Sequence, residues 1–161
     1  MPKKEVPISE IVKDKIYLSG IYAALDAPNI IKLGIDIVVT ILNFNPLSKN
    51  KKEYDENGIK RIFYYADDTE NFNISKYFDL FTKLVNNNPD KKILVHCYCG
   101  ISRSVILVAS YFVNNYNDLK LLENYNVPKI LEIIKNERCC ANPNKGFVQQ
   151  LVDYRNEKMH V

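Results

Sequence analysis

The chain has 161 residues, a length that suits a single domain and is sufficient to bury a hydrophobic core. Apolar residues make up 47% of the chain and charged residues 25%, and glycine and proline are sparse, so collagen-like and low-complexity classes are excluded. The net charge of +3 is modest, and the densest group of lysines, within positions 49–52, is followed at once by acidic residues, so we expect no nucleic-acid partner.

Strands and helices alternate through the first half of the chain. Residues 15–18 are predicted as a short strand, and residues 20–34 as a helical connection that ends at a capping glycine. The β-branched apolar run at 36–43 predicts a buried strand. A polar loop over 45–58 is expected to separate it from a further strand at 60–66.

The same alternation continues in the middle of the chain. Apolar residues recur at helical spacing over 74–87, and a short apolar strand follows at 92–96. A tight loop then leads into an almost wholly apolar segment at 104–114. A helix without a polar face is buried on all sides, so we expect this one to be central.

The last third of the chain is predicted to be helical. Residues 114–125 connect the central helix to the next one, and their leucines indicate an extra turn or short helix. Asn126 is expected to cap a following helix, and a final amphipathic helix is predicted over 144–158.

Strands that alternate with helices predict an α/β fold. We expect one domain, residues 1–161, with a central, mostly parallel sheet of four or five strands flanked by helices. The order of apolar strand, tight loop and apolar helix places residues 97–103 at the carboxyl end of a central strand. Open α/β sheets bind their ligands at that edge, so the functional site is expected there.

The segment HCYCGISRS at residues 96–104 has the composition of an anion-binding loop. The backbone N–H groups of such a loop converge on one point, and the helix N-terminus adds free N–H groups and partial positive charge. Cys97 opens the loop and Arg103 closes it, so the sulfur would lie beneath a bound phosphorus while the guanidinium holds two phosphoryl oxygens. The residues expected to bind the phosphate are Tyr98, Cys99, Gly100, Ile101, Ser102 and Arg103.

The positive field of this loop favours the thiolate form of Cys97 and makes it the predicted nucleophile. Attack on phosphorus would give a cysteinyl phosphate, which water then hydrolyses. Loop amides and Arg103 supply the charge stabilisation, so we expect neither a metal nor a cofactor. A zinc site built from the four cysteines is the rival interpretation. It is disfavoured by the Cys-x-Cys and Cys-Cys spacings and by the cationic arginine.

The loop resembles the His-Cys-x5-Arg-Ser signature of the protein tyrosine phosphatase superfamily, and the chain is similar to its compact, atypical dual-specificity phosphatases. Four other segments resemble that family in the same order: LSGIYAA from Leu18, ILN at 41–43, DDTENFNISKYF at 67–78 and ANPNKGFVQQL at 141–151. The resemblance covers nearly the whole chain. It implies the same α/β fold and cysteine-dependent phosphatase chemistry.

The resemblance also implies two further catalytic residues. The family carries an aspartate as general acid after the strand at 60–66, and the spacing to the following Asn-Ile pair favours Asp68 over its neighbour Asp67. An acid is needed because an alkoxide or phenolate leaves poorly without a proton. Ser104 would ease departure of the thiolate in the second step.

Other residues are expected to support the loop. His96 would order it through hydrogen bonds, and strand alternation turns its side chain away from Cys97, so it is not expected to be a general base. Asn43 would hold the loop from beneath. Arg138 matches a family arginine near the mouth of the site, although an exposed arginine at a helix end is an equally good interpretation. Cys99 is either a small loop filler or a redox partner of Cys97.

The sequence therefore predicts a protein phosphatase that acts on phosphotyrosine, phosphoserine and phosphothreonine in protein substrates. No lysine lies inside the loop, which favours phosphoproteins over highly anionic headgroups. Two alternatives stay open: a phosphatase for a glycan, lipid or RNA 5′ phosphate, and a non-catalytic phosphopeptide-binding module. Membrane-spanning and signal-peptide patterns are missing from the sequence, so we expect no membrane partner and a cytoplasmic protein that can enter the nucleus by diffusion.

Overall fold

The computed structural model describes residues 6–121 and 125–159. One five-stranded sheet has the order β1-β2-β5-β3-β4, in which β1 and β2 are antiparallel and the other neighbours are parallel. This confirms the predicted sheet, and β1 is a strand that the sequence analysis did not predict. The strands are β1 (Ser9–Val12), β2 (Ile16–Ser19), β3 (Ile37–Leu42), β4 (Lys60–Tyr65) and β5 (Ile93–His96).

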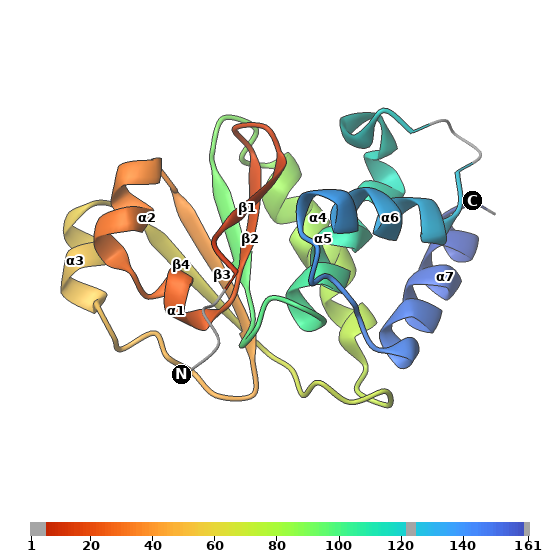
Figure 1. Cartoon of the computed structure of the whole chain (residues 1–161), viewed down its shortest axis with the longest axis horizontal. Helices are drawn as coiled ribbons and strands as arrows, with labels where there is room; N and C mark the ends of the chain where they lie inside the picture. The colour runs from red at the N-terminus through yellow and green to blue at the C-terminus, as the bar shows by residue number, and fades with distance from the viewer. Residues whose placement is uncertain (1–5, 122–124, 160–161) are drawn as a thin grey trace.

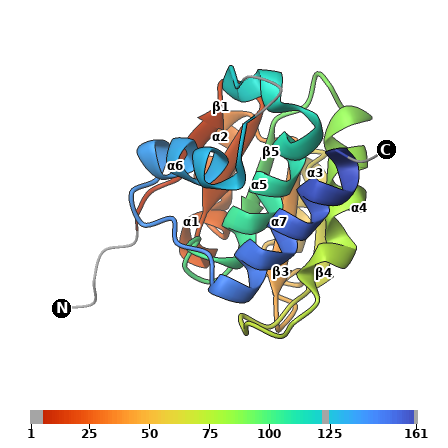
Figure 2. The same cartoon turned by 90° about the vertical axis from the view of Figure 1, so that its right-hand side faces the viewer.

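Helices cover both faces of the sheet, as Figures 1 and 2 show. One face carries α1 (Ile21–Ala24), α2 (Ala27–Leu33) and α3 (Lys51–Glu56). The other carries η1 (Ile74–Tyr77), α4 (Phe78–Asn86), α5 (Arg103–Asn114), η2 (Tyr116–Leu119), α6 (Val127–Glu137) and α7 (Lys145–Met159).

The alternation of side chains along the central strands divides the core in two. Val38 and Leu94 face the core under α1–α3, whereas Val39 and Val95 face the larger core under α4–α7. In that larger core α5 is buried over residues 103–113. This confirms the prediction that the apolar helix is central.

The predicted polar loop over 45–58 is wrong for Lys51–Glu56, which form α3. Tyr54 anchors this helix: it is fully buried, its hydroxyl donates to the carbonyl of Ala24 (2.6 Å), and the guanidinium of Arg61 lies 4.5 Å from its ring centre. A helix of under two turns has too few apolar positions to show a period, so the sequence could not reveal it.

The predicted extra turn within 114–125 is present as η2. The carboxylate of Asp118 accepts hydrogen bonds from Lys15 (2.9 Å) and from the hydroxyl of Tyr111 (2.6 Å), which ties η2 to the turn before β2 and to α5. Leu121 is buried against this segment, while Leu122 lies outside the described residues. Within those residues, no helix combines the length and the apolar character that a membrane crossing requires.

Candidate active site

The loop between β5 and α5 lies at the carboxyl end of the parallel strands, with β2 and β3 on either side of β5. Both ends of the loop are buried, since Cys97 is 2% exposed and Arg103 is 8% exposed. A pocket of about 520 Å³ opens above them and brings together the predicted nucleophile, arginine and acid. Its lining consists of Asn43, Phe44, Asp68, Cys97, Tyr98, Cys99, Ile101, Ser102 and Arg103.

Gly100 allows this loop to lie against its neighbours. Its φ of 68° falls in the left-handed region that favours glycine. A Cβ at this position would lie 2.5 Å from the guanidinium of Arg138 and 2.6 Å from the backbone of Ser19. On the same side, the N–H of Ile21 donates to the carbonyl of Tyr98 (2.9 Å), so the end of β2 and the start of α1 support the loop.

Arg138 holds the loop from behind, in a position that differs from both interpretations of the sequence. It is 1% exposed and does not line the pocket. Its guanidinium donates to the carbonyls of Gly100 (2.7 Å), Cys99 (3.2 Å) and Pro7 (2.9 Å), and to the hydroxyl of Ser9 (3.1 Å). Loop amides that face an anion direct carbonyls the other way, and these buried carbonyls need a donor.

His96 orders the other side of the loop, in line with the prediction. Its Nδ1 lies 3.0 Å from the carbonyl of Cys97 and its Nε2 lies 2.7 Å from the hydroxyl of Thr40. Because a carbonyl can only accept, Nδ1 carries the proton and Nε2 accepts from Thr40. Burial lowers the pKa of His96 from 6.5 to about 4, which keeps the imidazole neutral.

Thr40, rather than Asn43, is the residue whose side chain bonds to His96, directly before the loop. Asn43 lies beyond the end of β3, where its exposed side chain forms part of the pocket wall, so the predicted placement is wrong. Thr40 pairs with His96 in the register of β3 with β5. The sequence offers no local signal for Thr40, because its role depends on which strands become neighbours.

The guanidinium of Arg103 retains capacity to bind an anion. Its Nη1 donates to the carbonyl of Ala66 at the end of β4 (3.0 Å), and its buried Nε has no acceptor among the described residues. A buried donor without a partner is costly, and a phosphoryl oxygen would satisfy it. Nearby, the hydroxyl of Ser104 lies 3.1 Å from the sulfur of Cys97, where it can donate to a thiolate.

The N-terminus of α5 adds further donors to the anion site. Within the described residues, no side chain caps this helix at its N-cap, Ser102. The Ser102 hydroxyl instead accepts from the backbone N–H of Asn144 (3.0 Å). The first N–H groups of α5 and the positive end of its dipole thus stay available at the loop.

The structure separates the two adjacent candidates for the general acid. Asp68 lines the pocket, and its Oδ1 accepts a hydrogen bond from the side chain of Asn144 (2.9 Å). Asp67 does not line the pocket, and its carboxylate accepts from the hydroxyl of Tyr65 (3.1 Å). This placement supports Asp68 as the acid.

Aromatic side chains form the rim of the pocket. Tyr98 is 44% exposed and meets the ring of Tyr22 edge-on at 6.4 Å between centres, and Phe44 is 46% exposed on the pocket wall. Phe44 was missed by the sequence analysis, although an aromatic directly after Asn43, the end of the predicted strand, was available as a signal. Cys99 is also exposed at this rim, and its redox role stays a prediction.

The described residues contain no group of three or more His, Cys, Asp or Glu side chains that could hold a metal ion.

Comparison with known proteins places the chain in one family. A family model described as "Dual specificity phosphatase, catalytic domain" matches residues 16–157. A protein of Amsacta moorei entomopoxvirus, AMV078, named as a tyrosine-protein phosphatase, is 36% identical over 156 residues, covering 94% of this chain and 88% of the viral one. Tyrosine-protein phosphatase yvh1 of Schizosaccharomyces pombe is 31% identical over 150 residues. The alignment covers 91% of this chain but only 41% of that relative's length.

Solved structures agree with the fold. Human DUSP28 superposes with a TM-score of 0.80 at 17% identity, covering 97% of each chain. The Yvh1 phosphatase domain from Chaetomium thermophilum gives a TM-score of 0.79 at 21% identity, covering 94% of this chain and 97% of the other. At these identities the solved structures establish the architecture alone. Family membership rests on the matching family model and on the viral relative. The chain belongs to the family of dual specificity phosphatase catalytic domains.

Proposed function

We propose that the protein is a cysteine-dependent phosphatase that hydrolyses phosphotyrosine, phosphoserine and phosphothreonine in protein substrates. The observation that carries this proposal is the pocket in which Cys97 and Arg103 form the floor and Asp68 forms part of the wall. Family membership supports it, as do relatives named as tyrosine-protein and dual specificity phosphatases.

The first step is transfer of the phosphoryl group to sulfur. The thiolate of Cys97 attacks phosphorus, the S–P bond forms and the P–O bond to the leaving group breaks. Arg103 and the first N–H groups of α5 bind the phosphoryl oxygens. Asp68 gives its proton to the leaving oxygen and becomes a carboxylate.

The second step hydrolyses the cysteinyl phosphate. A water molecule attacks phosphorus, the carboxylate of Asp68 takes a proton from it, and the S–P bond breaks to release phosphate. The hydroxyl of Ser104, 3.1 Å from the sulfur, donates a hydrogen bond to the departing thiolate of Cys97. At the end of this step Asp68 has regained its proton and Cys97 is again a thiolate.

The substrate class is supported by the rim of the pocket. Tyr98 and Phe44 expose apolar surface beside the phosphate position, which suits a phosphorylated side chain presented by a protein. The loop itself holds no lysine that would recognise additional phosphates. We place the protein in the cytoplasm, where its protein substrates would be available.

A non-catalytic module is the second candidate. The fold alone does not exclude it, because one human protein with this fold is named as phosphatase-like and as an interacting protein. This tyrosine phosphatase-like serine/threonine/tyrosine-interacting protein superposes with a TM-score of 0.76 at 22% identity, covering 95% of this chain and 98% of that chain. The presence of nucleophile, arginine and acid in one pocket favours the enzyme.

Turnover of an aryl phosphate by the reduced protein tests the proposal. We expect steady-state turnover by the wild type. Cys97→Ser should abolish turnover while vanadate still binds, because Arg103 and the α5 N-terminus remain in place. A folded wild type that binds vanadate without turnover would instead establish a binding module.

A panel of phosphopeptides, a phosphorylated glycan, a phosphoinositide and an RNA 5′ phosphate then tests the substrate class. The phosphopeptides should give the highest kcat/KM. A higher kcat/KM on one of the other phosphates would overturn the proposal that proteins are the substrates.

A further inference from the structure

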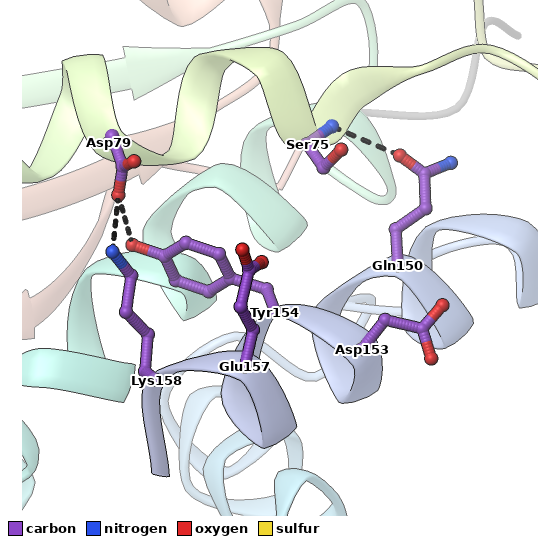
Figure 3. Close-up of a pocket in the computed structure, with 7 residues that line it drawn as sticks. All are labelled: Ser75, Asp79, Gln150, Asp153, Tyr154, Glu157 and Lys158. Atoms are coloured by element: carbon purple, nitrogen blue, oxygen red, sulfur yellow. Dashed lines mark hydrogen bonds and ion pairs between the residues drawn. The ribbon is translucent and has the colours of Figure 1, made fainter. Parts of the chain in front are cut away.

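The start of α7 contacts the chain around Asp68 at several points. We call residues 68–75 the acid segment. The side chain of Asn144 donates to Oδ1 of Asp68 (2.9 Å). The side-chain amide of Gln150 donates to the carbonyl of Phe72 (2.8 Å) and accepts from the N–H of Ser75 (3.0 Å). Figure 3 shows Gln150 reaching from α7 to the backbone of Ser75.

Between these two contacts the backbones themselves meet. A Cβ at Gly146 would lie 1.8 Å from the carbonyl oxygen of Glu70, so a side chain at this position would overlap the acid segment. Further along, the hydroxyl of Tyr154 and the ammonium of Lys158 bind Asp79 on α4 (Figure 3). The helix thus follows the acid segment and α4 along much of its length.

Asn144 links this contact to the phosphate loop. Its backbone N–H donates to the hydroxyl of Ser102 (3.0 Å), and its Oδ1 accepts from the N–H of Phe147 (2.9 Å), as an N-cap does. Because Oδ1 is held by this cap, the amide orientation is set, and Nδ2 faces Asp68. One side chain therefore relates the position of the carboxyl to that of the phosphate loop.

We propose that Asn144 is a positioning residue for the general acid, and that α7 holds the acid segment in its working place before substrate binds. This inference rests on the proposed phosphatase function. The amide of Asn144 donates to Oδ1 of Asp68, which leaves Oδ2 to deliver the proton in the proposed step. As the S–P bond forms and the P–O bond breaks, that proton passes to the leaving oxygen and Asp68 is left as a carboxylate.

The test compares variants that keep the helix cap with variants that do not. Asn144→Ser retains a capping oxygen and the backbone bond to Ser102 but loses the amide donor. Asn144→Ala loses the cap as well. Gln149→Ala is the matched control. The amide of Gln149 donates to Asp153 on the exposed side of α7 (2.9 Å), so the substitution removes none of the contacts to the acid segment given above.

The readout is the dependence of kcat on the leaving group. For an unsubstituted phenyl phosphate, we expect Asn144→Ser to lower kcat by about tenfold to 100-fold, because a misplaced acid donates its proton poorly. For a nitro-substituted aryl phosphate, whose phenolate leaves without a proton, the loss should be much smaller. Gln149→Ala should change neither. In an Asp68→Asn background, Asn144→Ser should have no further effect.

The outcomes distinguish failure of this inference from failure of the proposed phosphatase function. Equal losses on both aryl phosphates, or an added loss in the Asp68→Asn background, would show that Asn144 acts through general stability and would overturn the inference alone. A folded wild type without turnover would overturn the proposed function and this inference together. Thermal melting identifies variants that do not fold, and Asn144→Ser carries the test if Asn144→Ala is among them.

Discussion

At the scale of single residues, two adjacent carboxylates have different surroundings. Asp68 faces the pocket and is held by Asn144, whereas Asp67 lies outside the pocket and is held by Tyr65. A carboxyl can protonate a leaving group only if it reaches the scissile oxygen, so geometry distinguishes the two.

Amide variants of the two aspartates separate their roles. Asp68→Asn should lower kcat on phenyl phosphate by about 100-fold or more, because the proton donor is lost, and less on a nitro-substituted aryl phosphate. Asp67→Asn is the matched control and should stay near the wild type on both. Steady-state rates across a series of aryl phosphates measure this. The assignment fails if Asp67→Asn shows the leaving-group dependence and Asp68→Asn does not.

At the scale of elements, the phosphate loop depends on the segments that surround it. The end of β2 meets Gly100, and the start of α1 donates to the carbonyl of Tyr98. Arg138, directly after α6, binds the carbonyls of Gly100 and Cys99. The curvature of the loop is therefore supported by elements distant in sequence, and a side chain at Gly100 would separate them.

Two glycines allow this to be tested with a matched control. Gly58 and Gly100 have φ of 67° and 68°, so alanine costs roughly 1–2 kcal/mol of backbone strain at either position. Apart from Gly58 and its two chain neighbours, no described residue has an atom within 4 Å of a Cβ at that position, whereas Arg138 and Ser19 obstruct one at Gly100. Gly100→Ala should therefore lower the free energy of unfolding further than Gly58→Ala, and it alone should weaken vanadate binding. Urea denaturation and inhibition titrations measure both, and equal effects would contradict the argument.

At the scale of the whole molecule, the buried neutral His96 couples folding to pH. Its pKa is about 4 in the folded protein against 6.5 for an exposed histidine. Between these values the unfolded chain binds more protons than the folded one. Neutral His96 therefore makes its full contribution to the free energy of unfolding above pH 6.5. This contribution, on the order of 3 kcal/mol, is lost as pH falls from 6.5 toward 4.

Urea denaturation of wild type and His96→Gln across this range tests the coupling. The glutamine variant lacks the titrating group, so its free energy of unfolding should fall less steeply between pH 6.5 and 4.5. Other titrating groups are common to both proteins and cancel in the difference. Parallel curves would show that protonation of His96 does not oppose folding.

The sequence by itself determined the order of elements and the chemistry of the loop. Apolar periodicity is local, so β3, β4, β5 and α5 could be predicted from their own residues. Cys97 and Arg103 lie in one short loop between a buried strand and a buried helix, and their spacing alone indicates an anion site. The general acid needed the family resemblance in addition, because Asp67 and Asp68 are equivalent by composition.

Only the tertiary structure decided what supports that loop. Thr40 contacts His96 because β3 and β5 are neighbours, and Arg138 reaches the loop because α6 ends behind it. Asn144 meets Asp68 across 76 positions of sequence. These contacts depend on how the chain closes on itself, and a polar residue at a helix end has the same local pattern whether it caps, braces or faces solvent.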